Sequence, residues 1–339
     1  MKPLKEWIQR LFAERYPRKV IFRVDAGRVY GLSFGHLSRC LVLSKTIKSL
    51  SGCESIFLMR DYAEGVNHAC LSGEKVRTIP LNISPAEESE ALVGICRETG
   101  ADWLVVDLPY RDMDTSSFPT LREQGVKILF IDDDRFINPG VDAILNSNIL
   151  APTHMEKVPA GETGYFLGPD YFIFDEDAGK GPPVYSPRYL NVLLTFGGSD
   201  PTGVTIKVLD ALLTRNWPET FFRIILGPGY EDPGTVKELL KGKEGQYVVE
   251  VNPPNLISYL LGADLTVSAG GRTTYELLHL NRRFLPIATS ESESAAVAAL
   301  ERHGFVPDGM TSWDQDRFLE ILMNTHNSLQ KEVTAREKL

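Results

Sequence analysis

The chain has 339 residues, of which 43% are hydrophobic and 24% are charged, and its formal net charge is −9. This length predicts two domains of ordinary size, with cores large enough to need neither disulfides nor metals. The basic residues are scattered among acids, which argues against a DNA- or RNA-binding protein, so we expect no nucleic acid partner. The four cysteines form no C-x-x-C pair, which indicates free thiols and a cytoplasmic location.

The N-terminal segment has helical spacing of apolar side chains, with Leu4, Trp7, Ile8 and Leu11 on one face. This spacing predicts a helix that packs against the rest of the chain, and an amphipathic helix on a membrane surface is the alternative. No apolar stretch reaches the roughly 18 residues that a membrane span requires, so we expect no integral membrane segment.

Short apolar runs alternate with helical patterns in the first half of the chain. The predicted strands span residues 20–24, 55–59, 76–79, 103–107 and 127–131. The predicted helices span residues 36–50, 61–71, 85–99 and 115–123. Near-continuous apolar strands separated by helices are typical of a buried parallel sheet.

Residues 151–189 carry many Pro and Gly residues, and we interpret them as a connection between two domains that has some local structure. The alternation then resumes. The predicted strands are 190–196, 222–226, 247–251, 265–268 and 284–287, and the predicted helices are 204–213, 234–241, 256–261, 273–280 and 294–303, followed by a long polar helix at 313–339. We therefore expect an α/β protein with two Rossmann-like, doubly wound domains facing a cleft, at 1–165 and 166–315, and a C-terminal helix at 316–339.

The first candidate site follows the first predicted strand. Arg23 and Asp25 precede a glycine-rich loop that ends in Gly35-His36, where a helix begins. Glycines let the backbone approach a ligand closely, and a helix N-terminus favours the neutral imidazole that a general base needs. His36 is therefore a candidate base, and a histidine of the cap region without a catalytic role fits the pattern equally well.

Two further candidate sites follow predicted strands of the second half. The first consists of Gly197, Gly198, Ser199 and Asp200, and the second consists of Gly270, Gly271, Thr273, Thr274 and Glu276. Paired glycines between a strand and a helix can cradle a diphosphate, and a carboxylate one turn into the helix can accept ribose hydroxyls. Ordinary strand–helix turns, with a glutamate that compensates the helix dipole, are the alternative.

The run Asp132-Asp133-Asp134 raises the question of a metal site. Consecutive residues of an extended segment point to different sides, so few of them can share one ion. A capping or supporting role is favoured, and we expect no metal. Asn146 and Asn148 follow the next short strand and could line the ligand site.

Several motifs follow one another in order: Phe22-Arg23-Val24-Asp25, Gly35-His36-Leu37-Ser38-Arg39-Cys40-Leu41, residues 103–107, 128–133 and 144–146, Phe196-Gly197-Gly198-Ser199-Asp200-Pro201, residues 263–278 and, more faintly, 293–304. Taken together, they resemble the PseG/SpsG family, whose best-known member is the UDP-2,4-diacetamido-2,4,6-trideoxy-β-L-altropyranose hydrolase of pseudaminic acid biosynthesis. The resemblance implies a GT-B fold and an inverting hydrolysis of a UDP-linked sugar that needs neither metal nor cofactor. It also implies that His36 activates the attacking water.

The expected ligand contacts fall into two sets. The sugar side comprises Arg23, Asp25, Gly35, Asp107, Tyr110 and Asn146, and the nucleotide side comprises Gly197, Gly198, Ser199, Asp200, Gly270, Gly271, Thr273, Thr274 and Glu276. The family tends to have other residues at Leu108-Pro109 and at Glu291-Ser292, in loops that would face the ligand. A glycosyltransferase that uses a UDP-sugar donor and a non-catalytic nucleotide-sugar-binding protein therefore remain alternatives to the hydrolase.

Overall fold

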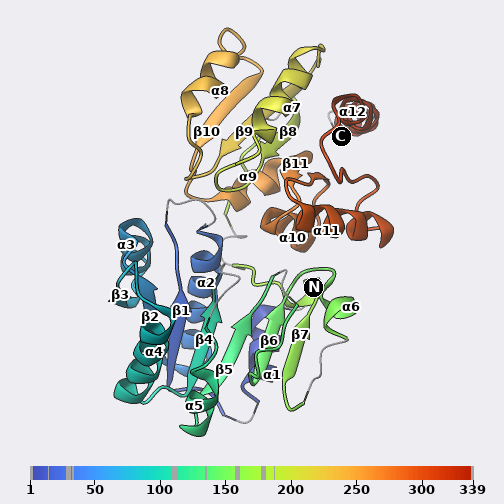
Figure 1. Cartoon of the computed structure of the whole chain (residues 1–339). Helices are drawn as coiled ribbons and strands as arrows, with labels where there is room; N and C mark the ends of the chain where they lie inside the picture. The colour runs from blue at the N-terminus through green and yellow to red at the C-terminus, as the bar shows by residue number, and fades with distance from the viewer. Residues whose placement is uncertain are drawn as a thin grey trace. The chain divides into compact units, whose positions relative to one another are not determined.

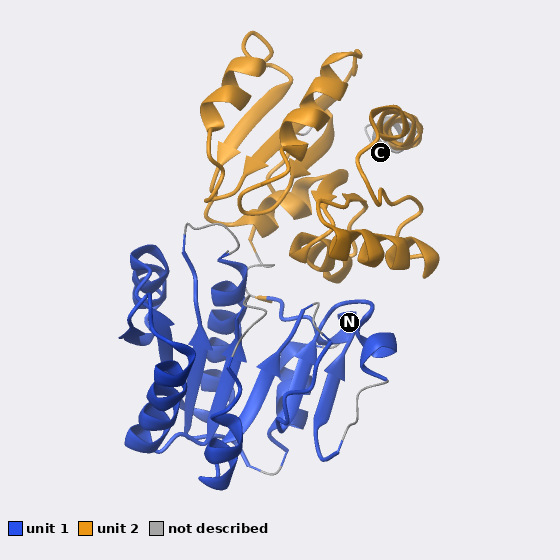
Figure 2. Ribbon diagram, in the orientation of Figure 1, with its two compact units in different colours: residues 1–174 blue, residues 175–339 orange. Residues whose placement is uncertain are grey.

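The computed structural model divides into two compact units, residues 1–174 and 175–339 (Figure 2). It describes residues 3–13, 15–27, 32, 34–108, 114–133, 136–156, 161–176, 181–186 and 188–336, with side chains described as far as residue 330. The boundary expected at residue 165 falls inside a strand of the first unit, β7 (Gly164–Leu167), whereas the observed division lies after Phe174.

The first unit is a seven-stranded parallel sheet with the order β3-β2-β1-β4-β5-β6-β7 (Figure 1). Its other strands are β1 (Lys19–Val24), β2 (Glu54–Arg60), β3 (Lys75–Ile79), β4 (Trp103–Asp107), β5 (Lys127–Ile131) and β6 (Ala143–Asn146). Its helices are α1 (Leu4–Leu11), α2 (Gly35–Ser51), α3 (Ala63–Leu71), α4 (Pro85–Thr99), α5 (Phe118–Glu123), α6 (Ala151–Met155) and the 3-10 turn η1 (Pro169–Tyr171). The strand order reverses between β1 and β4, where open α/β sheets bind ligands.

Side chains alternate between the two faces of this sheet, so each strand contributes to two cores. In β1, Phe22 and Val24 pack with α1 and α2, whereas Ile21 packs with α4 and α5 on the other face. Asp107 pairs in register with Val24, and Arg23 pairs with Val106. The side chains of Asp107 and Arg23 therefore lie on opposite faces of the sheet.

Two segments of this unit refine the sequence-based prediction. The apolar face of α1 packs into the unit, where Trp7 and Ile8 are buried and Trp7 lies 5.8 Å from the ring of Phe166. Residues 151–189, predicted to connect the domains with some local structure, contain α6, β7 and η1. β7 pairs with the β6 edge through four residues, too short a run to stand out among the surrounding prolines and glycines.

The second unit is a five-stranded parallel sheet with the order β10-β9-β8-β11-β12. Its strands are β8 (Leu190–Thr195), β9 (Thr220–Leu226), β10 (Tyr247–Val251), β11 (Leu265–Ala269) and β12 (Phe284–Ile287), and its helices are α7 (Val204–Leu213), α8 (Pro233–Leu239), α9 (Leu256–Gly262), α10 (Arg272–His279), α11 (Glu291–Arg302) and α12 (Gln315–Arg336). The C-terminal helix α12 belongs to this unit, because Phe318 and Leu322 share its main core with α7.

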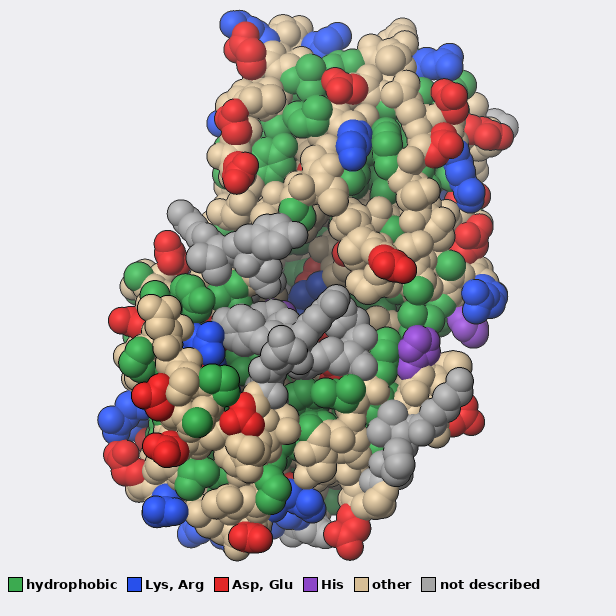
Figure 3. Space-filling view, in the orientation of Figure 1, with side chains coloured by type: hydrophobic (Ala, Val, Ile, Leu, Met, Phe, Trp, Pro, Cys, Tyr) green, Lys and Arg blue, Asp and Glu red, His purple; other side chains and the backbone are tan. Residues whose placement is uncertain are grey.

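Charged side chains of both signs are interspersed on the face drawn in Figure 3, without a large basic patch. Within the described part of the chain, no helix is long and apolar enough to cross a membrane.

Candidate active site

A histidine and several polar or acidic side chains of the first unit lie at the carboxyl ends of its central strands. His36 is the second residue of α2, which follows β1, and Asp107 is the last residue of β4. Asp132 and Asp133 come directly after β5, and Asn146 ends β6. His36 and Asp107 lie where the strand order reverses, between β1 and β4, and β5 and β6 follow next to β4 in the sheet, so the topology brings residues that are far apart in the sequence to one edge.

His36 and Asp107 form a hydrogen-bonded pair. The Nδ1 atom of His36 lies 2.7 Å from Oδ1 of Asp107, which is fully buried. Nη2 of Arg39 also lies 3.0 Å from Nδ1, but both of its N–H groups are directed to Asp107 and Asp133. An ionised carboxylate only accepts hydrogen bonds, so the contact with Asp107 places the proton on Nδ1. The neutral imidazole then carries its free lone pair on Nε2, the arrangement in which a histidine can accept a proton from a ligand.

Arg39 holds this pair in place from one turn further along α2. Its guanidinium donates to both oxygens of Asp107 at 2.5 Å and to both oxygens of Asp133 at 2.6 and 2.9 Å. The Sγ atom of Cys40 adds a weaker contact to Asp107 at 3.5 Å. Arg39 thus joins two carboxylates that come from different strands.

Electrostatics keep both carboxylates ionised. Burial by itself would raise the pKa of Asp107, but the charges of Arg39 and His36 and their hydrogen bonds outweigh it and hold that pKa well below its ordinary value. For Asp133, whose side chain is about half exposed, partial desolvation is outweighed by the charge of Arg39 and its hydrogen bonds, so its pKa is lowered too. In the same way, the two carboxylates outweigh the effect of burial on Arg39 and raise its pKa well above the usual value.

Asp132 and Asn146 support the loops at this edge. Asp132 accepts a 2.6 Å hydrogen bond from the backbone N–H of Phe136 and a 3.4 Å hydrogen bond from the side-chain amide of Asn146. The side-chain oxygen of Asn146 accepts from the backbone N–H of Asn148 at 3.0 Å. Both side chains are buried, so the structure places Asn146 in a supporting network.

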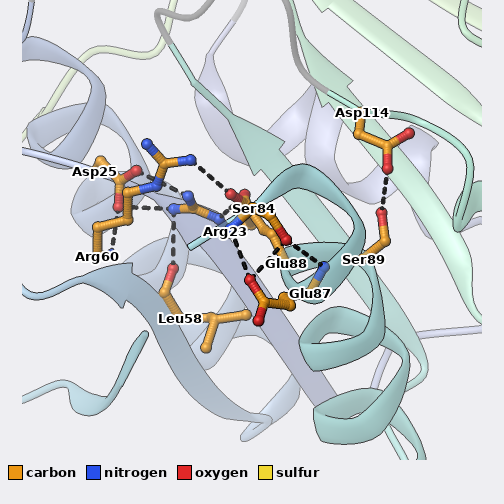
Figure 4. A network of polar contacts seen from close by, with 9 residues as sticks. All are labelled: Arg23, Asp25, Leu58, Arg60, Ser84, Glu87, Glu88, Ser89 and Asp114. Atoms are coloured by element: carbon orange, nitrogen blue, oxygen red, sulfur yellow. Dashed lines mark hydrogen bonds and ion pairs between the residues drawn. The ribbon is translucent and has the colours of Figure 1, made fainter. Parts of the chain in front are cut away.

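Arg23 and Asp25 belong to a separate network on the opposite face of the sheet (Figure 4). The guanidinium of Arg23 donates to both oxygens of Asp25 at 2.7 and 2.8 Å and to Glu88 of α4 at 2.8 Å. Arg60 donates to the other oxygen of Glu88, and its backbone N–H donates to Asp25. The side chains of Arg23 and Asp25 are fully buried. Both were expected beside the sugar, but the structure commits them to each other and to α4.

In the second unit, the turn after β8 is built by glycines. Gly197 has a φ of +82°, which favours glycine, and Gly197, Gly198 and Ser199 are exposed. The turn after β9 lies directly against it, since a Cβ atom on Gly227 would lie 2.5 Å from Cα of Gly198. The absence of side chains at Gly198 and Gly227 therefore lets the turns after β8 and β9 approach each other closely at the carboxyl edge of this sheet.

Asp200 has a structural task in the same turn. Its carboxylate accepts hydrogen bonds from the backbone N–H groups of Val204 at 2.9 Å and Thr205 at 2.7 Å, at the start of α7. The side chain is buried, so this carboxylate satisfies the donors of the helix N-terminus that we had expected to face a nucleotide.

The turn after β11 places Gly270 and Gly271 at the start of α10. Of the hydroxyls predicted here, that of Thr274 is buried and donates to the carbonyl of Ala269 at 3.0 Å, whereas Thr273 is partly exposed. Glu276 is partly exposed and accepts a 3.2 Å hydrogen bond from Arg272. Thr273 and Glu276 therefore keep access to solvent, and Thr274 serves the turn itself.

The sequence analysis assigned no role to two residues that the structure places at these sites, Arg39 and Glu293. Arg39 binds Asp133, for which a capping or supporting role was expected, beside His36. Glu293 of α11 lies against the second glycine turn, since a Cβ atom on Gly271 would lie 2.9 Å from its Oε1 atom. Tyr110 and Asp134 lie outside the described residues. Among the residues that are described, no three His, Cys, Asp or Glu side chains are grouped to hold a metal ion.

The chain matches no known protein-family profile. It is 25% identical to the uncharacterized protein MJ1062 of Methanocaldococcus jannaschii over 261 residues, which are 74% of this chain and 51% of that protein. It is 24% identical to the spore coat polysaccharide biosynthesis protein SpsG of Bacillus subtilis over 170 residues, which are 49% of this chain and 50% of SpsG. The chain spans about half the length of the curated relatives it matches.

Solved structures with similar folds cover nearly the whole chain. MurG of Acinetobacter baumannii has a TM-score of 0.62 at 13% identity, over 94% of both chains. The chain has the GT-B fold. Anabaena Alr3699/HepE, in complex with UDP-glucose, has a TM-score of 0.61 at 13% identity, over 93% of this chain and 92% of that chain. UDP-GlcNAc 2-epimerase of Neisseria meningitidis, bound to UDP-GlcNAc, has a TM-score of 0.58 at 12% identity, over 93% of each chain. At these identities the similarity establishes the architecture and leaves the reaction to the residues of the site.

Proposed function

We propose that this chain is a hydrolase of a UDP-linked sugar, with His36 as the general base and the second unit as the nucleotide-binding unit. The expected substrate is a UDP-linked diacetamido-trideoxy sugar used in nonulosonic acid or surface polysaccharide biosynthesis. The motifs that resemble the PseG/SpsG family support this substrate, and the distant similarity to the spore coat polysaccharide biosynthesis protein SpsG supports a role in polysaccharide biosynthesis.

The observation that carries the proposal is the His36–Asp107 pair. With Nδ1 committed to Asp107 at 2.7 Å, Nε2 can take a proton from water. The water oxygen bonds to the anomeric carbon, the proton passes to Nε2, and the bond between that carbon and the diphosphate oxygen breaks. The bonding electrons leave with UDP, a stable anion. The configuration at the anomeric carbon inverts because water attacks opposite the leaving group.

The charges around His36 suit this proton transfer. Asp107 and Asp133 contribute two negative charges and Arg39 one positive charge, so the group sums to −1 with a neutral imidazole and to zero once the imidazole is protonated. A positive charge that forms on His36 during the reaction is therefore neutralised locally, without reorganisation of solvent.

The second unit supports binding of a nucleotide diphosphate. Its glycine turns at Gly197-Gly198 and Gly270-Gly271 lie at the carboxyl ends of β8 and β11, and α10 begins directly after the second turn, where a helix N-terminus favours anions. Two proteins of the same fold, HepE and UDP-GlcNAc 2-epimerase, were solved with UDP-glucose and UDP-GlcNAc. A UDP-sugar is therefore the ligand class to test first.

A glycosyltransferase would use the same base on an acceptor hydroxyl instead of water. An amphipathic N-terminal helix on a membrane surface would favour a glycosyltransferase with a membrane-bound acceptor. The structure removes this argument, because Leu4, Trp7 and Ile8 of α1 are buried in the first unit. The buried face of α1 therefore removes one argument for the transferase, and the reaction is decided by the test below.

The test is release of UDP from UDP-sugars, followed with and without extracts that contain acceptors. Release in water alone supports hydrolysis, release only with an acceptor supports transfer, and binding without release supports a non-catalytic role. His36→Asn should lower turnover by about 10²- to 10⁴-fold and leave UDP affinity nearly unchanged. Near-normal turnover of this variant would refute the role of His36.

A further inference from the structure

Asp107 and Asp133 are bound by the same arginine but differ in how fully their oxygens are used. A carboxylate can accept about four hydrogen bonds, two on each oxygen. Oδ1 of Asp107 accepts from His36 and Arg39, and its Oδ2 accepts from Arg39 and, more weakly, from Cys40. Each oxygen of Asp133 accepts one hydrogen bond, from Nη1 and from Nη2 of Arg39. Among the described residues, no protein group fills the other acceptor positions of Asp133.

The remaining acceptor positions of Asp133 are accessible to a ligand. Its side chain is about half exposed, whereas that of Asp107 is fully buried. The two bonds from Arg39 fix the plane of the Asp133 carboxylate, so a ligand that binds to it need not order this side chain first. Asp133 is therefore an exposed acceptor whose orientation is already set.

The charge of this carboxylate decides which part of a ligand it can contact. Partial desolvation would raise the pKa of Asp133, but the charge of Arg39 and its hydrogen bonds lower it, so the carboxylate is ionised at neutral pH. An ionised carboxylate accepts hydrogen bonds and donates none, and it repels phosphate. The group that contacts Asp133 must therefore be a hydrogen-bond donor and cannot be the diphosphate of a nucleotide sugar.

Asp133 lies beside the proposed base. Nη2 of Arg39 is 2.9 Å from Oδ2 of Asp133 and 3.0 Å from Nδ1 of His36, so one nitrogen atom separates the carboxylate from the imidazole. In the proposed reaction His36 acts at the anomeric carbon. That carbon has two neighbours in the sugar ring, namely the ring oxygen, which carries no hydrogen, and C2. The donor nearest to the reacting carbon is therefore the hydroxyl or the amide N–H on C2.

We propose that Asp133 accepts a hydrogen bond from the donor on C2 of the sugar and thereby selects UDP-sugars that carry such a donor. This rests on the proposed reaction of a UDP-sugar at His36. In the diacetamido sugar expected above, the donor is the acetamido N–H on C2. Because Asp133 is half exposed, water can take the place of a missing donor, and the discrimination should be about 10-fold. A fully enclosed polar site would reject such an analogue by about 10⁴- to 10⁵-fold.

The test measures dissociation constants by calorimetry for UDP, UDP-GlcNAc, UDP-glucose and UDP-2-deoxyglucose, which differs from UDP-glucose only in lacking the C2 hydroxyl. The full-length protein carries His36→Asn, which slows turnover and leaves the bonds between Arg39 and Asp133 in place. UDP-glucose and UDP-GlcNAc should bind about 10-fold more tightly than UDP-2-deoxyglucose. Adding Asp133→Ala should remove this difference. The affinity for UDP should then stay the same or rise, because a negative charge is removed.

Asp61→Ala is the matched control. Asp61 is an exposed aspartate directly after β2, at the carboxyl edge of the same sheet. Its replacement removes the same charge, so the 10-fold difference between UDP-glucose and UDP-2-deoxyglucose should remain. Asp133→Ala should fold, because Asp133 is half exposed and Arg39 keeps Asp107 as a partner, and a cooperative thermal transition checks this.

If Asp133 only holds Arg39 in place, its replacement will change the affinities for both sugars by the same factor, and this result would overturn the proposal. Equal affinities for UDP-glucose and UDP-2-deoxyglucose before Asp133 is replaced would overturn it too, as would failure of all three UDP-sugars to bind at millimolar concentration. Discrimination that depends on Asp133, together with no release of UDP from any UDP-sugar by the wild type, would support the contact and reject the proposed reaction. The two failures are therefore distinguishable.

Discussion

Replacing Asp107 by asparagine should switch the imidazole of His36 to its other tautomer. The carboxylate accepts from Nδ1 of His36 at 2.7 Å and from two nitrogens of Arg39 at 2.5 Å. An asparagine has one oxygen and one NH₂ group. Oδ1 accepts from both His36 and Arg39, and Oδ2 accepts from Arg39, so either orientation of the amide places its NH₂ group against a donor of Arg39. With the NH₂ group in the place of Oδ1, Nδ1 becomes an acceptor, the proton moves to Nε2, and the lone pair needed by the base is lost.

The expected loss of turnover is large and the expected loss of stability is moderate. Exchanging the orienting carboxylate of a Ser-His-Asp triad for an amide lowers kcat by about 10⁴-fold, and general base catalysis as a whole contributes about 10² to 10⁴. Asp107→Asn should therefore lose at least 100-fold in UDP release. Arg39 keeps Asp133 as a partner, so the free energy of unfolding should fall by about 1.5–3 kcal/mol, the contribution of a hydrogen bond to a charged group.

Two measurements check this prediction. Long-range ¹H–¹⁵N spectra of the imidazole report which nitrogen carries the proton, and the rate of UDP release at saturating UDP-sugar reports turnover. Glu88→Gln is the matched control, because it removes a carboxylate that pairs with Arg23 and Arg60 on the opposite face of the sheet. It should cost similar stability and leave turnover unchanged. A wild-type imidazole protonated on Nε2, or near-normal turnover of Asp107→Asn, would refute the reasoning.

Two further predictions concern stability. Asp200→Ala should lower the free energy of unfolding by about 1–2 kcal/mol in urea titrations, because the backbone N–H groups of Val204 and Thr205 lose their cap. Asp200→Asn should largely restore the stability, since an amide oxygen can accept the same hydrogen bonds. A tenfold loss of UDP affinity in both variants would instead make Asp200 a ligand residue. His326 is buried, lies 2.7 Å from the hydroxyl of Thr220, and has a pKa lowered by burial, so the unfolded chain binds the extra proton more readily. Stability should therefore be full above pH 6.5 and decline below it, by at most about 1.4 kcal/mol per pH unit for this one proton. The pKa of His279 is lowered as well, so the wild type must be compared with His326→Gln. The free energy of unfolding of this variant should fall less steeply with decreasing pH than that of the wild type. Identical slopes would exclude His326 as a contributor.

Most strands could be predicted because each is a continuous apolar run between helical segments, as the strand predicted at 103–107 and observed as β4 shows. β7 could not be predicted, because a strand of four residues can pair with the edge strand β6 without a marked hydrophobic pattern in its own sequence. The end of α4 illustrates where local chemistry is readable, since Pro85 follows the capping residue Ser84, and Gly100 adopts the left-handed conformation after the last turn.

The site was only partly predictable. His36 and Asp107 could be proposed from their places after strands, but the role of Arg39 depends on contacts with residues 68 and 94 positions away. Such contacts follow from strand order and register, which the sequence does not state. Arg23 looked equally suited to a ligand until the register placed it opposite Val106, on the face that α4 covers.

The two arginine networks of the first unit show what separates a structural charge cluster from a chemical one. Each has one arginine held by two carboxylates at the carboxyl end of the sheet, Arg23 with Asp25 and Glu88, and Arg39 with Asp107 and Asp133. In the first, the side chains of Arg23 and Asp25 are fully buried, so the pair cannot exchange protons with a ligand. In the second, the side chain of His36 is 15% exposed and that of Asp133 is 46% exposed. A proton accepted by His36 can therefore come from a bound molecule, while Asp107 and Arg39 beneath it keep the imidazole in one tautomer. The two clusters have the same composition of charged residues, so composition alone cannot distinguish them. Only the Arg39 cluster has access to solvent and contains an imidazole that can accept a proton, and it is therefore the one suited to proton transfer.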